Sequence, residues 1–560
     1  DKNGGLKKVC RFSSKEFYVR PEDIEFYKKI RVPLPTLSPE ERMRRKIAYL
    51  PGYEFFKVKS SASGKDIVTV YPPGTKFKIY EHLVWFSSKF NPKEFGQKVD
   101  DNIPFFEQFA KLQESIPRPN LTTDTSNVNS DYTSNSRHLK NCYLAFDSIN
   151  GENLYYFECC QKNKDCVDCW ACDDSDSCYK SWGKKLFKCF FVHNSENCLE
   201  SYFLFDCKNC QNCFMSSNLR NKKYCFYNKQ FTKSDYETKL KEINPGDYSI
   251  LQKYLKEFEE LKQNAIHKAV IGQNVINSYG TWLWDVKNCY CVSYAHGCEN
   301  VAYSMGMVYY DDSYDVFGGM DSELCYELTN MWSGGNYNVK FSSFIDTSEN
   351  LEYCDLCWNC SNCFGCIGLT NKSYYIFNVQ YDEKDYWHVV DRLKTGMLKR
   401  GEYGEFFPPE MSPFPYNHSI VAFYAGYDDF ENAKRYGYWF QDAKRTQDQE
   451  RPEVISSKDL PLDIKDVDNS ILERAVFDEE NKRNFRITKY ELQFYRKYKI
   501  PLPRIHPVIR MAEWRKGLDL QIRFYERECG KCKKKTVTMY APDRPEKNIW
   551  CESCYLSEIG

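Results

Sequence analysis

Small apolar residues return at fixed, short steps through the middle of the chain. The most regular step is 12 residues, at which a Cys, Leu or Val follows an Asn, Asp or Ser. This step links Cys142, Leu154, Cys166 and Cys178, returns at Cys198 and Cys210, and returns again at Cys289, Val301, Cys325, Leu351 and Cys363. Finer steps of six and three join Cys160, Cys166, Cys172 and Cys178, and Cys354, Cys357, Cys360, Cys363 and Cys366.

These steps do not suit a helix. An α-helix repeats every 3.6 residues, so a strict step of six or 12 held for more than about forty residues cannot keep one helical face buried. Short strands joined by turns can stack as parallel coils, with Cys, Leu and Val inward and Asn, Asp and Ser at the turns. Cysteine suits such an interior because it is small and has weak hydrogen-bonding demands. The pattern therefore predicts a β-solenoid.

The repeated cysteines have three interpretations. The first is an inert, buried ladder of thiols. The second is a metal site, which the step of three from Cys354 to Cys366 suggests, although side chains three apart on a strand point to opposite faces and converge only if a turn intervenes. The third is a set of disulfides. The odd total of 27 cysteines in a 560-residue chain favours reduced thiols and a reducing compartment.

The repeat region is duplicated at an offset of 150 residues. Between Cys207–Tyr236 and Cys357–Tyr386, 14 of 30 positions are identical. Each copy ends in the pattern L-x-N-K-x-Y-x-x-x-N-x-Q and continues into a helical stretch, which we expect to cap an open end of the solenoid. The duplication predicts one solenoid unit at 119–270 and a second at 271–400, each with capping helices.

A second duplication, at an offset of 468, relates the two ends of the chain. A segment with FYKK and VPLP at the N-terminus matches one with FYRK and IPLP near the C-terminus. The C-terminal copy continues into two Cys-x2-Cys pairs, Cys529, Cys532, Cys551 and Cys554. Two such pairs at this separation can place four thiolates in a tetrahedron, so the sequence predicts a zinc-ribbon module at 466–560 with one structural Zn²⁺.

The N-terminal module lacks the matching thiols. Ser60-x2-Ser63 stands where a Cys-x2-Cys pair is expected, and Cys10-x2-Ser13 has the form of half a lost pair. We therefore predict a metal-free, zinc-ribbon-like module at 1–118 and interpret Cys10 as an unremarkable thiol. A Pro- and aromatic-rich connector is expected at 401–465.

The order of these segments resembles a known family. The FYxKxxxPLP segment, the ribbon, FFEQF at 105–109, two sets of cysteine repeats, GEYGEFFPPEMSPFPYN at 401–417 and the final four-cysteine ribbon are similar to an uncharacterised family of Cys-repeat and zinc-ribbon proteins encoded in candidate-phyla (Patescibacteria-type) bacterial genomes. The resemblance spans nearly the whole chain. It implies no established activity, and the CoA-transferase label carried by some members has no support in these residues.

The charges are balanced over the whole chain but unevenly distributed along it. Lys+Arg and Asp+Glu both total 78, which excludes a uniformly basic nucleic-acid binder. Residues 482–536, however, carry 17 basic against 5 acidic side chains, and residues 1–50 carry 13 against 7. Basic terminal modules on a repeat scaffold predict contact with nucleic acid or the ribosome, with Lys533, Lys534 and Lys535 as contact residues. The alternative is an ordinary solvated surface.

Catalytic signals are weak. Residues 281–339 hold one Lys and eight acids, including Asp311, Asp312, Asp315, Asp321 and Glu323, and carboxylates on a strand face could bind Ca²⁺ or act as acid and base. No motif fixes a pair, and a solvated turn near Gly318 is the simpler interpretation. The eight histidines are scattered, and neither G-x4-G-K-[ST] nor G-x-G-x2-G occurs.

The sequence therefore predicts a mainly β scaffold or binding protein, more plausibly non-enzymatic, made of tandem parallel β-solenoid units with zinc-ribbon-like α+β modules at both termini. The alternative is a polysaccharide-binding or carbohydrate-active β-helix protein. We expect the solenoid units to form a rod with a module at each end. No apolar run is long enough for a membrane span and no signal peptide is evident, so a cytoplasmic location is expected, although the chain begins at Asp1 rather than Met.

Overall fold

The chain folds into strand-rich ladders covered by smaller α+β modules. The computed structural model describes residues 4–123, 125–130, 132–146, 148, 150–158, 166–167, 172–173, 177–303, 305–311, 313–314, 316–329, 335–423, 429–441, 453–516 and 523–560. Strand makes up 31% of the structure and helix 27%. The prediction of a strand-rich chain is therefore confirmed, with more helix than the description "mainly β" implies.

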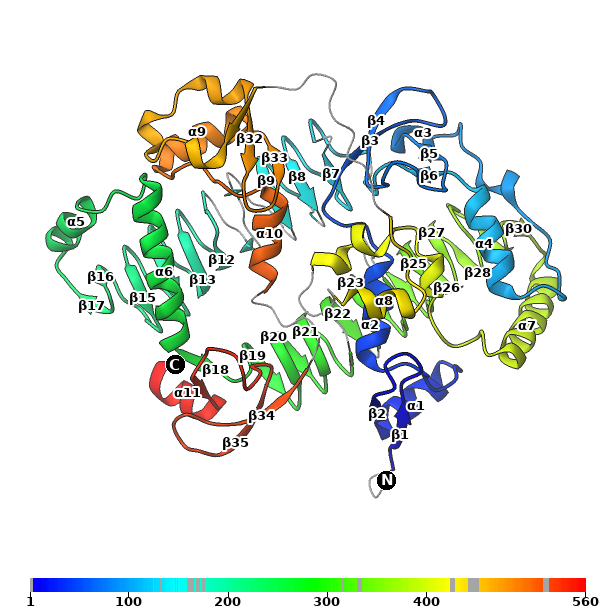
Figure 1. The fold of residues 1–560 in the computed structure, drawn as a ribbon. Coiled ribbons are helices and arrows are strands. Elements are labelled where there is room, and N and C mark those ends of the chain that lie inside the picture. The colour runs from blue at the N-terminus through cyan, green and yellow to red at the C-terminus, as the bar shows by residue number, and fades with distance from the viewer. Residues whose placement is uncertain are drawn as a thin grey trace.

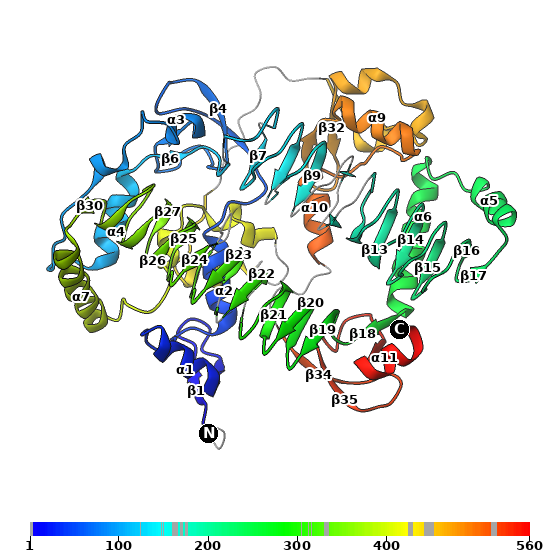
Figure 2. The same ribbon diagram turned by 180° about the vertical axis from the view of Figure 1, so that it is seen from behind.

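Most strands belong to two parallel ladders (Figures 1 and 2). The first ladder consists of β7 Thr133–Ser134, β8 Tyr143–Phe146, β9 Leu154–Glu158, β10 Cys166–Val167, β11 Cys172–Asp173, β12 Trp182–Lys184, β13 Phe190–Glu196, β14 Tyr202–Phe205, β15 Phe214–Ser217, β16 Cys225–Phe226 and β17 Lys229–Gln230. The second ladder consists of β19 Gly272–Ile276, β20 Tyr279–Lys287, β21 Tyr290–His296, β22 Met305–Asp311, β23 Phe317–Glu323, β24 Asn336–Tyr337, β25 Ser343–Asp346, β26 Glu349–Glu352, β27 Asp355–Trp358, β28 Ser361–Phe364, β29 Ser373–Ile376 and β30 Val379–Gln380.

Neighbouring segments of each ladder pair in parallel at a register of 12 residues. Phe190 lies opposite Tyr202 and Tyr202 opposite Phe214, while Glu349 lies opposite Ser361 and Ser361 opposite Ser373. The hairpins β16–β17 and β29–β30 end the ladders with antiparallel pairs. The 12-residue step in the sequence is thus the distance after which the chain returns beside itself.

A left-handed backbone residue occurs at every third position. In the first ladder these positions run from Asn197 through Glu200, Phe203 and so on to Tyr227, and in the second from Phe341 to Phe377. Each bends the chain, so the residue that follows it points inward every time. The buried interiors accordingly contain residues spaced by three, such as Cys207, Cys210 and Cys213. The expectation that side chains three apart alternate between faces is wrong here, because a turn separates them.

Asparagine fills many of the left-handed positions, and its side chains bond from one level to the next. Asn197 Nδ2 donates to Asn209 Oδ1 at 3.1 Å, and Asn209 Nδ2 donates to Asn221 Oδ1 at 2.9 Å. Asparagine tolerates this backbone conformation better than most residues, and such amide ladders stabilise stacked strands. These contacts explain why Asn precedes the inward residue in the sequence pattern.

The helices cover flanks and ends. They are α1 Pro21–Lys29, α2 Pro39–Ala48, α3 His82–Trp85, α4 Phe105–Ser115, α5 Lys233–Lys241, α6 Tyr248–Asn264, α7 Glu383–Arg400, α8 Phe430–Arg435, α9 Lys489–Tyr498, α10 Pro507–Lys516 and α11 Glu552–Ile559. Of the helices expected as caps, α6 instead packs along the side of the first ladder, where Phe258 meets Phe203 at 5.6 Å between ring centroids. Its amphipathic face covers apolar side chains on the flank of the ladder.

Short antiparallel hairpins build the terminal modules. They are β1 Leu6–Val9 with β2 Glu16–Val19, β3 Phe56–Lys59 with β4 Asp66–Thr69, β32 Ala475–Asp478 with β33 Arg483–Phe485, and β34 Tyr525–Glu528 with β35 Lys535–Thr538. The remaining strands are β5 Ile79–Tyr80, β6 Arg118–Pro119, β18 Ile266–Lys268, β31 Val454–Ser456 and β36 Asn548–Trp550.

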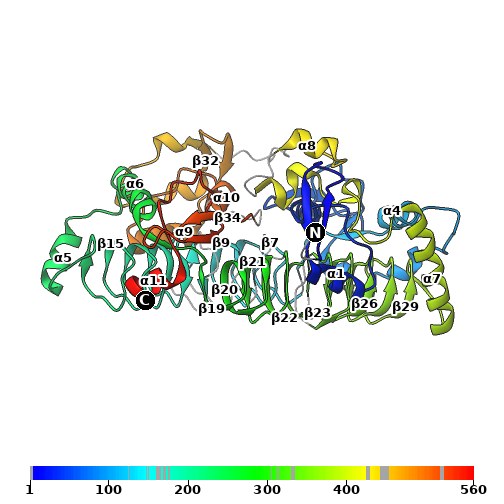
Figure 3. The same ribbon diagram turned by 90° about the horizontal axis from the view of Figure 1, so that it is seen from below.

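The terminal modules lie against the ladders rather than beyond their ends, and Figure 3 shows β32 and α10 above a layer that contains both ladders. Phe26 of α1 stacks on Tyr314 of the second ladder at 3.9 Å. The two ladders also meet each other, with the Trp182 and Trp282 rings 4.7 Å apart. The expected rod with a module at each end is therefore wrong, because the exposed aromatic flanks of the ladders are what the modules bury.

Candidate metal centre

The four cysteines predicted as zinc ligands converge in the C-terminal module. Cys529 and Cys532 lie on the turn between β34 and β35, where Lys533 takes a left-handed conformation. Cys551 precedes the first turn of α11, and Cys554 lies within that helix. All four sulfur atoms lie within 4.8 Å of one another. In the part of the chain that the structure describes, this is the one group of at least three such side chains close enough to hold a metal ion.

Backbone hydrogen bonds hold the first thiol in place. The Cys551 N–H donates to Cys529 Sγ at 3.3 Å, and the Cys529 N–H donates to the Lys534 carbonyl at 2.9 Å. Burial opposes ionisation of Cys529, but backbone N–H groups of Cys532, Cys551 and Lys531 point at its sulfur and lower its pKa to about 6. Backbone donors around Cys529 therefore favour its thiolate, the form that binds metal.

The second cysteine pair, Cys551 and Cys554, completes the four-sulfur group. Cys532 Sγ and Cys551 Sγ are 3.7 Å apart. The Ser553 hydroxyl beside Cys551 lowers the pKa of that thiol, whereas burial and the three neighbouring sulfurs raise the pKa of Cys554 to about 12. Four sulfur donors without a carboxylate or histidine suit a closed, tetrahedral site for a soft divalent cation and leave no open position for a substrate.

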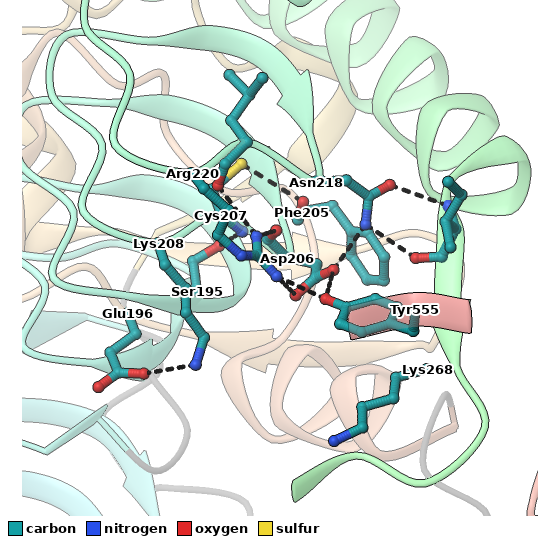
Figure 4. A network of polar contacts seen from close by, with 12 residues as sticks. Ser195, Glu196, Phe205, Asp206, Cys207, Lys208, Asn218, Arg220, Lys268 and Tyr555 are labelled. Carbon is teal, nitrogen blue, oxygen red and sulfur yellow. Dashed lines mark hydrogen bonds and ion pairs between the residues drawn. The ribbon is translucent and has the colours of Figure 1, made fainter. Parts of the chain in front are cut away.

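The C-terminal module is anchored to the first ladder by a polar network (Figure 4). Tyr555 Oη donates to the Asp206 carboxylate and accepts from Arg220 Nη2 at 2.6 Å. Arg220 Nη2 lies 3.2 Å from Asp206 Oδ1, and Asn218 Nδ2 donates to Asp206 Oδ2 at 2.6 Å. Burial raises the pKa of Asp206 even with Arg220 beside it. Because Tyr555 directly follows Cys554, the metal centre and the anchor share one helical turn.

A strand pair adds to this anchor. Strand β36 pairs in parallel with β18, the segment that enters the second ladder. Thr538 Oγ1 donates to the Ala269 carbonyl at 2.8 Å, and Lys268 Nζ lies 2.8 Å from Glu552 Oε1. The module thus contacts the chain between its two ladders.

In the N-terminal module, Ser60 and Ser63 occupy the corresponding turn. Both hydroxyls donate to the carboxylate of Glu81, which precedes α3. Burial acts to raise the pKa of Glu81, but these hydrogen bonds outweigh it and the pKa lies below the usual range. Sequence reasoning missed Glu81, because its partners are visible only once the hairpin brings residues 60 and 81 together.

Of the two alternatives for Cys10, a surface or a buried thiol, the structure shows the buried one. Although burial acts to raise the pKa of Cys10, hydrogen bonds from the Ser13 hydroxyl and from backbone groups of Ser13, Ser38 and Phe12 lower it.

Of the five acidic residues considered for chemistry, the structure describes the side chains of two. Asp321 and Glu323 lie exposed on β23. Asp312 and Asp315 and the side chain of Asp311 lie outside the described residues.

The ladder thiols are held as hydrogen-bond donors. Most of the described ones donate to the carbonyl two residues before them, as Cys210 does to Lys208 at 3.3 Å and Cys354 to Glu352 at 3.5 Å. Burial raises the pKa of Cys325 to about 12 and that of Cys354 well above its usual range. Every cysteine whose side chain is described is a free thiol.

No protein-family model, no curated protein and no solved structure matches this chain. Among the described residues, no helix has the length and apolarity needed to cross a membrane.

Proposed function

We propose that this protein is a non-enzymatic scaffold made of two β-solenoid units and a C-terminal zinc ribbon, and that it binds a polyanion through the ribbon. The solenoid assignment is supported by the 12-residue parallel register, the left-handed residue at every third position and the interiors filled with thiols. These features give coils whose interior is packed side chains rather than a channel.

Zinc is the proposed occupant of the four-cysteine group. The four sulfurs can surround one ion, and a tetrathiolate is the usual ligand set of structural zinc. We assign the ion a structural role, since it would tie the β34–β35 turn to the start of α11. We also propose a reducing, cytoplasmic location, which the free thiols support, and membership of the Cys-repeat and zinc-ribbon family named above.

The observation that carries the binding proposal is the turn between the first two ligands. Four lysines lie within residues 531–535. Lys531 pairs with Glu558 and Lys535 with Glu526. Lys533 and Lys534 are exposed, and within the described residues they make no ion pair. Uncompensated cations on a rigid turn suit the phosphates of a nucleic acid, which such contacts bind without sequence preference.

Fluorescence anisotropy with a labelled 20-nucleotide RNA tests this proposal. Affinity should fall steeply with salt, and K533Q/K534Q should flatten the logarithmic salt slope by about 1 to 2, since each phosphate contact contributes about 0.7–0.9. The matched control K458Q/K465Q changes two lysines outside the ribbon and should leave the slope unchanged. Binding that ignores salt, or an unchanged slope for K533Q/K534Q, would refute the polyanion role.

A further inference from the structure

The terminal modules repeat one geometry four times, whereas the sequence shows only two related ends. In each, a hairpin turn carries the first and second ligand positions, and a later helix carries the fourth, with the third just before it. The left-handed residue lies four positions after the first of these, at Ser14, Gly64, Lys482 and Lys533. These helices are α2, α3, α10 and α11, and in the first and third modules α1 and α9 lie between the turn and the helix.

The backbone hydrogen bonds of three turns are nearly the same. Cys10 N–H donates to Lys15, Ser60 N–H to Lys65 and Cys529 N–H to Lys534, each five residues on, at 2.8, 2.8 and 2.9 Å. The next residue donates to the segment just before the helix in each case: Arg11 to Thr36, Ser61 to Ile79 and Gly530 to Ile549. The fourth turn keeps the same hairpin register, with Asp478 opposite Arg483.

These registers align the four ligand positions of the metal centre with four residues of every other module. The sets are Cys10, Ser13, Ser38 and Glu41; Ser60, Ser63, Glu81 and Val84; Asp478, Asn481, His506 and Ile509; and Cys529, Cys532, Cys551 and Cys554.

In the second and third sets, hydrogen bonds of a carboxylate occupy the position that corresponds to the metal centre. In the third set, Asp478 Oδ2 accepts from His506 N–H at 2.9 Å, just as Cys529 Sγ accepts from Cys551 N–H. Asp478 Oδ1 also accepts from Asn481 N–H at 3.1 Å. In the second set, the Glu81 carboxylate accepts from both serines.

The way the modules dock supports the same alignment independently. The residue after the fourth ligand position faces a ladder in the second and fourth modules: Tyr555 bonds Asp206 of the first ladder, and Trp85 meets Trp358 of the second ladder at 5.5 Å. Tyr303 Oη donates to Asp23 of α1 at 2.9 Å, and Tyr156 Oη donates to Glu491 of α9 at 2.7 Å. The N-terminal modules thus dock on the second ladder as the C-terminal ones dock on the first.

We infer that residues 4–50, 51–120, 453–516 and 523–560 are four copies of one module built around a shared metal position, and that the Glu81 carboxylate takes the place of the ion in the second copy. This second position accepts a soft divalent cation such as zinc when its four side chains are cysteine. The inference rests on the proposed zinc ribbon only for the identity of the ion. Metal dependence in this protein is thereby confined to the last module.

The forward test is S60C/S63C/E81C/V84C in the full-length chain, with bound zinc and Co²⁺ absorption measured under reducing conditions. The variant should bind one more equivalent than the wild type and give the cobalt–thiolate spectrum of a tetrathiolate. S60C/S63C, with only one pair, should lack the tetrathiolate spectrum at this position. The same four changes in a C532S/C554S background should bind one ion, which separates this position from the ribbon.

The reciprocal test places the residue types of the second set, Ser, Ser, Glu and Val, at the four cysteine positions of the last module. C529S/C532S/C551E/C554V should fold without zinc, keep the amides of β36 protected from hydrogen exchange, and resist a chelator that exposes those amides in the wild type. A folded forward variant that binds no additional ion would overturn the inference. If the forward variant fails to fold, loss of β36 protection in the reciprocal variant would overturn it instead.

Discussion

The guanidinium of Arg118 lies 2.6 Å from the carboxylate of Asp355, and both side chains are almost completely buried. Arg118 belongs to β6, which pairs with β5 of the N-terminal module, and Asp355 begins β27 of the second ladder. The Arg118 guanidinium also lies over the Phe77 ring at 4.9 Å. One buried ion pair therefore joins two segments 237 residues apart in sequence.

Removing one partner of this pair should be costly. R118M leaves the Asp355 carboxylate buried without its cation, which typically costs about 3–5 kcal/mol. Chemical denaturation followed by tryptophan fluorescence should show the loss, while the exposed pair of Arg392 and Asp101, broken by R392M, should cost at most about 1 kcal/mol. Equal effects of the two substitutions would contradict the role given to Arg118.

The anchor of the C-terminal module should weaken when Tyr555 loses its hydroxyl oxygen. Y555F removes a donor to Asp206, a carboxylate that is buried and keeps Arg220 and Asn218. The expected cost is about 1–3 kcal/mol, seen as faster hydrogen exchange in β18 and β36. Y279F, at an exposed tyrosine, serves as the control. Unchanged exchange in Y555F would show that the network does not hold the module.

The ladder interior should accept a hydroxyl but not a larger side chain. Ser195 already donates to the carbonyl two residues before it at 2.9 Å, and the Cys210 thiol makes the equivalent contact. C210S should therefore cost about 1 kcal/mol, whereas C210L overpacks a closed interior and should cost about 1–3 kcal/mol. Thermal unfolding under reducing conditions compares the two, and a stabilising C210L would mean that the interior has room.

Stability should fall at alkaline pH. Burial raises the pKa of Cys325 to about 12, from an ordinary thiol value near 9. A group with a raised pKa contributes stability below its unfolded pKa, and that contribution is lost as the pH rises from about 9 to about 12, at roughly 1.4 kcal/mol per unit for one thiol. C325S removes the contribution of this thiol, so the free energy of unfolding of the variant should fall less steeply between about pH 9 and about pH 12 than that of the wild type. Parallel pH profiles of the two proteins would contradict the assignment.

Much of the ladder could be predicted from the sequence, because the residues that fill its interior recur every 12 positions. The 12-residue spacing of Cys142 and Leu154 reports how far the chain travels before it returns. The step of three was equally visible at Cys354 and Cys357, but its meaning depends on backbone torsion. Tyr353 and Leu356 adopt a left-handed conformation that neither residue type favours, and stacking imposes it.

The candidate metal centre was predictable because four cysteines bind one ion in a fixed local spacing. Glu81 and Asp478 were not, since each replaces the ion with hydrogen bonds that no spacing rule describes. Docking of the modules was also beyond the sequence. Tyr555 and Asp206 are 349 residues apart in sequence. No local pattern around either residue indicates that the two side chains will be in contact.

The central claim is a single structural metal ion in the last module, with the ladder thiols free of metal. The most direct test is elemental analysis of purified, reduced wild-type protein beside C532S/C554S, with thiols counted in the folded state. The account predicts one zinc per chain in the wild type and none in the variant. No metal in the wild type, or several ions that persist in C532S/C554S, would contradict it.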